Sequence, residues 1–277
     1  MLQTRKRRAA SERAGIQMNR CSGLLTSLVW LISHAAHAQP TMQYYQEGSR
    51  AFVEQRLDAA IEALKQSLTL DPKQLGAIRL LGLSYQLAGR PDEAELQFEA
   101  ACRLAPNDAE SWFYLGRLRY VRNNFDKALT ALQTAARHSP GDARIRECLA
   151  LTLEVTGDWM AAEREYRLAA RAGAKQPATL PLNYGALLLK LNRIAESEPL
   201  LQRAAAELPS SWQAHFELAK LYCHTDRFEA GLGELKAALA SSPTAEERAR
   251  TYGLMAVAYS RLGRYEEARL AALSAEK

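Results

Sequence analysis

Glu147 and Glu154 are the two residues of this sequence whose types and spacing come nearest to a catalytic pair. They are seven residues apart, so on an α-helix both carboxylates lie on one face. An enzyme would need an acid, a base and a nucleophile together on such a surface. A solvated acidic stripe along a helix is the commoner explanation of this spacing, and we interpret the pair in that way.

Cysteine and histidine offer the next candidates for nucleophilic or metal chemistry. Cys223 and His224 are adjacent, and His215 lies nine residues earlier. A metal site normally uses three or four ligands at helical or hairpin spacing, and the two histidines lie on different sides of their helix. The sequence also has no Gly-x-Ser-x-Gly, no phosphate loop and no His-Glu-x-x-His. We therefore predict no enzymatic activity, no cofactor and no metal.

The elements that position these residues follow a period of 34 residues, which is marked by prolines. At position 174, where the period predicts another proline, the sequence has Ala174. The prolines of the series are Pro72, Pro106, Pro140, Pro209 and Pro243. A fixed period of this length indicates one small structural unit that has been copied and stacked.

Each unit carries the pattern of two helices. Its apolar residues recur three and four positions apart, which marks one face of a helix. The break between the two helices is seen in Gly89-Arg90-Pro91, where glycine suits a helix end and proline a helix start. Gly82, Gly116 and Gly185 lie inside first helices, where glycine costs about 1 kcal/mol relative to alanine. We expect them to allow close contact with the second helix.

The third unit contains Trp112-Phe-Tyr-Leu115-Gly116, then Ala128, Leu132 and Pro140. This resembles the tetratricopeptide repeat family, whose signature is Trp-x2-Leu-Gly-x2-Tyr, then Ala-x3-Phe, then Pro. The resemblance implies an all-α fold, a right-handed superhelical solenoid of about seven helix-turn-helix repeats over residues 39–277. The repeats are placed near 41–74, 75–108, 109–142, 143–176, 178–211, 212–245 and 249–277.

The resemblance also implies a concave groove, which the first helices line and which contacts an extended peptide or a partner helix. The candidate groove residues are Tyr45, Arg79, Leu83, Phe113, Tyr114, Arg117, Tyr120 and Lys220. Aromatic residues and arginine are the types most often found at binding hot spots. The alternative is that several of these side chains only pack between repeats.

The first 38 residues differ from the repeats. Six Lys/Arg and one acidic residue are followed by an apolar run at 24–32 and by Ala36-His37-Ala38. This order is typical of a secretory signal peptide, and we predict cleavage after Ala38. An uncleaved anchor is the alternative, and Met18 is a second candidate for the true start. Residues 39–277 then hold 30 Lys/Arg and 30 Asp/Glu, which leaves no global charge to attract nucleic acid.

Together these features predict a non-catalytic scaffold that is exported to the periplasm or secreted and binds a protein or peptide partner. It has no stable membrane span after cleavage. Cys102, Cys148 and Cys223 belong to non-adjacent repeats, so we expect free thiols. Two alternatives remain. One is an accessory subunit of an envelope enzyme or of a secretion or assembly complex, and the other is self-association through the surface at Ala271-Ala272-Leu273.

Overall fold

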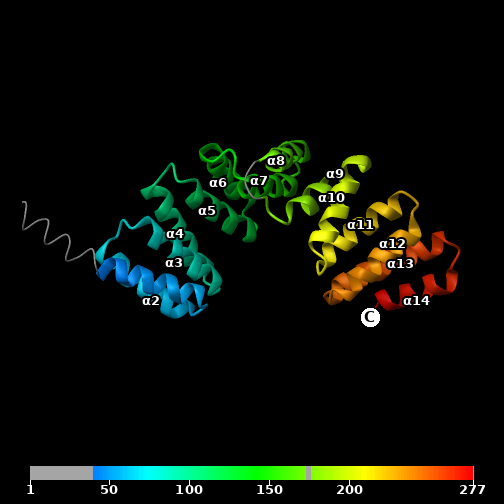
Figure 1. The fold of residues 1–277 in the computed structure, drawn as a ribbon, viewed down its shortest axis with the longest axis horizontal. Coiled ribbons are helices and arrows are strands. Elements are labelled where there is room, and N and C mark those ends of the chain that lie inside the picture. The colour runs from blue at the N-terminus through cyan, green and yellow to red at the C-terminus, as the bar shows by residue number, and fades with distance from the viewer. Residues whose placement is uncertain (1–39, 173–175, 277) are drawn as a thin grey trace, which may run out of the picture. The chain divides into compact units, whose positions relative to one another are not determined.

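The computed structural model describes residues 40–172 and 176–276, and in these ranges every regular element is an α-helix (Figure 1). The predicted all-α fold is confirmed. The predicted signal peptide and Ala174 lie outside the described residues. The helices follow one another as pairs: 40–53 with α2 (Leu57–Leu70), α3 (Leu75–Leu87) with α4 (Pro91–Leu104), α5 (Ala109–Val121) with α6 (Phe125–His138), α7 (Ala143–Val155) with α8 (Trp159–Arg171), α9 (Leu180–Lys190) with α10 (Ile194–Glu207), α11 (Trp212–His224) with α12 (Phe228–Ala240), and α13 (Ala245–Arg261) with α14 (Tyr265–Ala275).

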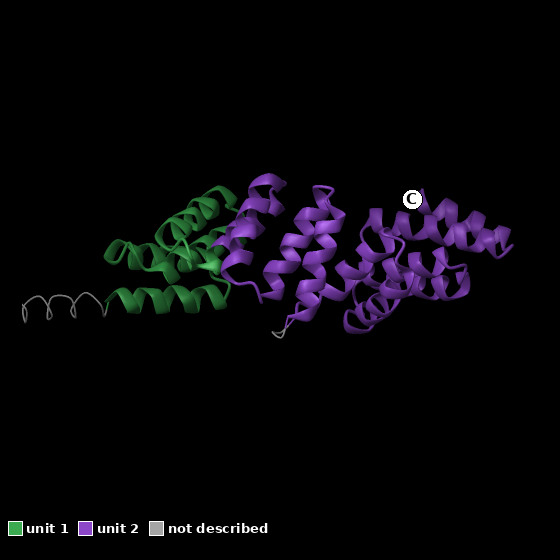
Figure 2. Ribbon diagram, turned by 90° about the horizontal axis from the view of Figure 1, so that it is seen from above, with its two compact units in different colours: residues 1–111 green, residues 112–277 purple. Residues whose placement is uncertain are grey.

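The pairs are distributed over two compact units (Figure 2). Unit 1 ends at Ser111 and unit 2 begins at Trp112, so the boundary falls in the first turn of α5. Within unit 1, α3 packs against both α2 and α4; within unit 2, α7 packs against both α6 and α8. Each helix mainly contacts its neighbours in the chain, which is the packing pattern of a repeat protein.

The turns between paired helices use a left-handed residue. Gly89, Gly157 and Gly263 have φ values of 71°, 88° and 73°, which matches the helix-end role predicted for Gly89. The remaining pairs reach the same backbone conformation without glycine, at φ values of 57° to 59°. The residues are Gln55, Asn123, Asn192 and Asp226. Asparagine and aspartate tolerate this conformation better than other side chains, so these turns carry a weaker sequence signal.

Three of the turns carry the same arginine–tyrosine stack. In each, the arginine just before the second helix lies 4.6 Å from the ring centroid of a tyrosine five residues earlier. The pairs are Tyr85–Arg90, Tyr222–Arg227 and Tyr259–Arg264. A cation–π contact at an exposed site contributes about 0.5–1 kcal/mol. The spacing Tyr-x4-Arg is therefore a local stabilising element of the turn, and sequence analysis did not identify it.

Glycines inside first helices mark the closest approach of the paired helices. A Cβ atom at Gly82 would lie 2.6 Å from Phe98 Cε1, and one at Gly116 would lie 2.6 Å from Leu132 Cγ. At Gly185 the corresponding distance, to Leu201, is 2.9 Å. The prediction that these glycines permit close helix contact is confirmed.

We expect Gly116→Ala to lower the free energy of unfolding by about 1–2 kcal/mol. The added methyl group would overpack a well-filled contact, and Leu132 cannot yield fully because its backbone nitrogen also lies 3.2 Å from the new Cβ position. Gly233→Ala is the matched control, since that helical glycine has no atom within 4 Å of its Cβ position. There the higher helix propensity of alanine should raise stability by about 0.5–1 kcal/mol. Urea denaturation followed by circular dichroism measures both changes. If both variants were stabilised, or both destabilised, the result would contradict the expectation.

The seventh pair begins earlier than the repeat placed at 249–277. Helix α13 starts at Ala245 because Thr244 and Glu247 form a capping box, in which each side chain accepts a hydrogen bond from the other residue's backbone N–H. The Thr-x-x-Glu spacing was available in the sequence as a helix-start signal. The extra turn places Arg248 and Arg250 on a helix.

Candidate functional site

In unit 1, the candidate groove residues are already engaged in packing. The Tyr45 hydroxyl lies 3.0 Å from the position that a Cβ would take at Gly76 of α3, so the ring covers this glycine. Arg79 Nη1 forms an ion pair with Asp108 Oδ2 at 3.0 Å, and the same oxygen accepts a hydrogen bond from Ser111 N–H at 2.8 Å. Leu83 is partly exposed on α3. Asp108 therefore caps α5, and Arg79 is paired with it there.

In unit 2, α5 presents an aromatic group with one arginine. The Arg117 guanidinium lies 5.9 Å from the Phe113 ring centroid and 5.7 Å from that of Tyr114. Phe113 is only 4% exposed, whereas Tyr114 and Arg117 are partly exposed. Tyr120 packs edge-on against Phe125 at 5.7 Å, and burial, assisted by the negative charge of Glu154, raises the pKa of the Tyr120 hydroxyl. Phe113 thus supports the surface that Tyr114 and Arg117 present.

A second arginine reaches the same ring from the next pair. Arg144 of α7 places its guanidinium 5.2 Å from the Phe113 centroid, and it also forms an ion pair with Asp142 at 2.7 Å. Asp142 accepts a hydrogen bond from Arg144 N–H at 2.9 Å and so caps α7. Arg144 is not among the groove residues predicted from the sequence, and only its contact with Phe113 places it at this surface.

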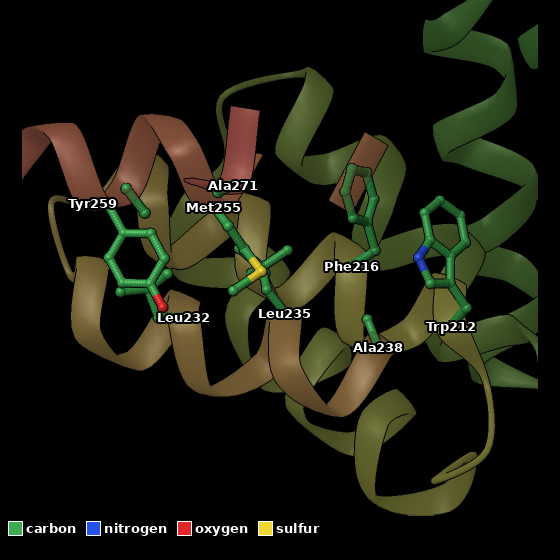
Figure 3. Packing of buried hydrophobic residues seen from close by; sticks show 10 residues of the cluster. Trp212, Phe216, Leu232, Leu235, Ala238, Met255, Tyr259 and Ala271 are labelled. Atoms are coloured by element: carbon green, nitrogen blue, oxygen red, sulfur yellow. The ribbon is translucent and has the colours of Figure 1, made fainter. Parts of the chain in front are cut away.

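The same arrangement recurs between α11 and α13. The Arg250 guanidinium lies 5.1 Å from the ring centroids of both Trp212 and Phe216. These two rings stack with their centroids 4.6 Å apart. They lie side by side at one end of the hydrophobic cluster that α11, α12, α13 and α14 form (Figure 3). The three-residue displacement of the seventh repeat concealed Arg250 in the sequence. Lys220, a predicted groove residue on α11, donates a hydrogen bond to Glu217 at 2.7 Å.

A hollow of about 650 Å³ lies beside Arg144 in unit 2. Its lining comes from the loop before α7 and from the segment before α9. The lining residues are Ser139, Gly141, Asp142, Arg144, Gln176, Pro177 and Ala178. A ligand side chain held at Arg144 would therefore find an adjoining space that it can enter.

The acidic pair on α7 is not a solvated stripe, and this interpretation was wrong. Glu147 is only 5% exposed, and its Oε1 accepts hydrogen bonds from Thr179 Oγ1 and Asn183 Nδ2, both at 2.8 Å. Burial raises the pKa of the Glu147 carboxyl. Glu154 accepts a hydrogen bond from Lys190 of α9. The two carboxylates therefore join α7 to α9, across the junction where the proline period fails.

Among the described residues, neither the thiols nor the groups of His, Cys, Asp and Glu side chains form a recognisable nucleophilic or metal-binding site. Cys102, Cys148 and Cys223 are not joined in disulfide bonds, and burial raises the pKa of Cys148 to about 12. Such a thiol is almost entirely protonated near neutral pH and is a weak nucleophile. No group of three or more His, Cys, Asp or Glu in the described residues has the geometry to hold a metal ion. None of the described helices is both long and apolar enough to cross a bilayer.

Successive pairs of helices that pack mainly on their neighbours in the chain define an α-helical repeat protein. Profiles of the tetratricopeptide repeat match residues 86–152, residues 45–109 and 185–246, and residues 249–275. The chain therefore belongs to the tetratricopeptide repeat family. A comparison with curated protein sequences found no significant match.

Several solved structures share the fold. The chain is similar to one chain in the structure of the APC/C hetero-tetramer Cut9–Hcn1, with a TM-score of 0.68 and 19% identity, and the match covers 79% of this chain and 42% of that chain. It is similar to PilW, described as a widely conserved type IV pilus biogenesis factor, with a TM-score of 0.63 and 18% identity over 71% and 90%. It is also similar to YrrB, described as having an unusual peptide-binding site, with a TM-score of 0.55 and 21% identity over 64% and 90%. At these identities the likeness establishes the fold alone.

Proposed function

We propose that this protein is a non-catalytic scaffold of the cell envelope that binds a peptide or protein segment on the first-helix face of unit 2. The observation that carries the proposal is the aromatic and basic surface of α5 and α7, where Tyr114 and Arg117 are partly exposed above the buried Phe113 ring. Aromatic rings with arginine are the usual composition of binding hot spots. The peptide-binding site named for YrrB supports a similar use of the fold here.

The cellular location forms part of the same proposal. The basic segment, the apolar run and the Ala-x-Ala site within residues 1–38 favour export and cleavage after Ala38. The pilus biogenesis role named for PilW is one example of a similar fold in envelope assembly. A scaffold in this compartment would hold a component of an envelope complex without acting on it chemically.

Photocrosslinking in intact source cells tests the proposal. A photoreactive phenylalanine analogue at Tyr114 should yield a defined crosslinked product in the exported fraction, and Arg117→Glu in the same chain should abolish it. The matched control places the analogue at Leu168, which is 45% exposed on the second helix α8. Equal products at both positions, insensitivity to Arg117→Glu, or a product confined to the cytoplasm would contradict the proposal.

A further inference from the structure

Unit 2 repeats one contact between an aromatic ring and an arginine of the following pair. Phe113 of α5 is covered by Arg144, near the start of α7, at 5.2 Å. Phe216 of α11 is covered by Arg250, near the start of α13, at 5.1 Å. In both cases the ring belongs to one first helix and the guanidinium to the next first helix. Stacking on a ring limits the freedom of a long side chain, so the charged group is held at a defined place.

Unit 1 has the corresponding ring without the corresponding charge. Tyr45 stands 31 residues before Gly76, as Phe113 stands 31 residues before Arg144. Glycine occupies the arginine position there, and the Tyr45 ring packs directly over it. The residue 34 positions after Tyr45, which corresponds to Arg250 after Phe216, is Arg79, and its charge is paired with Asp108. In unit 1, therefore, neither position presents an arginine without a carboxylate partner.

Two of the guanidinium groups in unit 2 keep an unused capacity for anions. Arg117 and Arg250 are held by aromatic rings, and among the described residues neither has a carboxylate within ion-pair distance. A guanidinium is planar and presents a fork of N–H donors that matches a carboxylate in a bidentate manner. Because the rings position these groups in advance, a carboxylate that binds them pays little ordering entropy.

The net charges of the two units also differ, with unit 1 acidic and unit 2 basic. Residues 40–111 contain seven Lys/Arg and eleven Asp/Glu, whereas residues 112–277 contain 23 Lys/Arg and 19 Asp/Glu. The balanced charge of residues 39–277 therefore conceals an acidic unit 1 and a basic unit 2. Opposite charge steers a partner toward the surface that complements it.

Apolar groups accompany the basic ones on the first helices. Val121 and Val155 are the last residues of α5 and α7, stand 34 residues apart, and are 65% and 50% exposed. A sugar–phosphate backbone gains little from such side chains, whereas the aliphatic side chains of a polypeptide can bury them. The surface therefore favours a mixed acidic and apolar polypeptide over a nucleic acid.

We propose that unit 2 recognises an acidic protein segment, whose Asp or Glu side chains bind Arg117 and Arg250 and whose apolar side chains contact Val121 and Val155. This inference rests on the proposed function, since it names the class of segment that the first-helix face accepts. Arg144 assists at Phe113, where its own pair with Asp142 leaves it partly neutralised.

Selection from a random 12-residue peptide phage library on the immobilised full chain tests the inference. We expect the selected peptides to be at least threefold enriched in Asp and Glu over the starting library. The double variant Arg117→Gln/Arg250→Gln should lose this enrichment. A synthetic peptide from the selection should bind that variant at least about tenfold more weakly, because two charge-assisted contacts are lost. The matched control is Arg164→Gln, at an exposed arginine on the second helix α8, and it should behave as wild type.

The outcomes separate the inference from the proposed function. Peptides that are selected without acidic enrichment, or that bind the double variant as tightly as wild type, would overturn the acidic specificity and leave peptide binding intact. Failure to select any peptide would count against both. Tighter binding of a 20-nucleotide oligothymidylate than of the acidic peptide, with loss in the double variant, would identify a nucleic-acid surface instead. Circular dichroism confirms that each variant is folded.

Discussion

Replacing Tyr166 by alanine is expected to lower the free energy of unfolding by about 3–5 kcal/mol, the range found when a large buried aromatic residue is truncated. Tyr166 is the largest side chain of the described residues that is fully buried, and its ring stacks on Tyr184 of α9 at 5.6 Å. The contact joins the fourth and fifth pairs of helices. The loss of protection against hydrogen exchange should therefore be largest in α8 and α9, at the junction where the proline period fails.

Tyr166→Phe separates the ring from its hydroxyl group. The hydroxyl makes a long hydrogen bond of 3.4 Å to Glu154 Oε2, so its removal should cost less than about 1 kcal/mol. Urea denaturation followed by circular dichroism gives both values, and hydrogen exchange of α8 and α9 locates the change. A loss below about 1 kcal/mol for Tyr166→Ala would show that the junction does not depend on this ring.

The second large effect is expected at Glu147. Glu147→Ala should lower the free energy of unfolding by about 2 kcal/mol, because Thr179 and Asn183 lose the acceptor that joins them to α7. Glu147→Gln keeps one carbonyl oxygen that can accept both hydrogen bonds. At pH 7 we therefore expect the glutamine variant to be as stable as wild type or more stable. A strong loss in Glu147→Gln alone would mean that the negative charge itself is required.

The pH dependence gives an independent check on the same carboxyl. Burial raises the pKa of Glu147 above its ordinary value of 4.5, so the folded protein holds this proton more tightly than the unfolded chain. The resulting stabilisation is complete below pH 4.5 and is lost as the pH rises through the folded-state pKa. The stability of Glu147→Gln relative to wild type should therefore increase over that interval. A difference that stays constant or decreases from pH 4 to pH 7 would contradict the assignment.

These two sites also explain how the chain continues through its irregular junction. The proline expected at position 174 is absent, and α8 and α9 are separated by a longer connection than the other pairs. The stacked tyrosines and the Glu147 hydrogen bonds supply contacts between α7, α8 and α9 that do not depend on the proline. The glutamates that first suggested catalysis thus have a structural role in the described residues.

The repeat period and the helix pairs could be predicted from the sequence because they depend on local rules. Apolar spacing defines a helix face, proline and glycine mark helix ends, and a glycine inside a helix must be compensated by close packing. The contacts at Gly82, Gly116 and Gly185 therefore followed from the sequence. Seven repeats in agreement strengthened each local inference.

The sequence predicted which groove residues lie on first helices, but it did not predict which side chains these residues contact. Register placed Tyr114 and Arg117 on a first helix, and the structure shows them partly exposed there. It could not show that Arg79 is paired with Asp108. It also missed Arg250, because the capping box at Thr244 moved the start of α13.

The sequence by itself determined the tetratricopeptide architecture, because each repeat encodes its own helices and turns. Only the tertiary structure decided that Glu147 is buried and that Arg144 and Arg250 stack on rings of the preceding first helix. The physical reason is that burial and ion pairing depend on which side chains of adjacent repeats meet. Residues 31 to 38 positions apart come into contact only after the helices have packed.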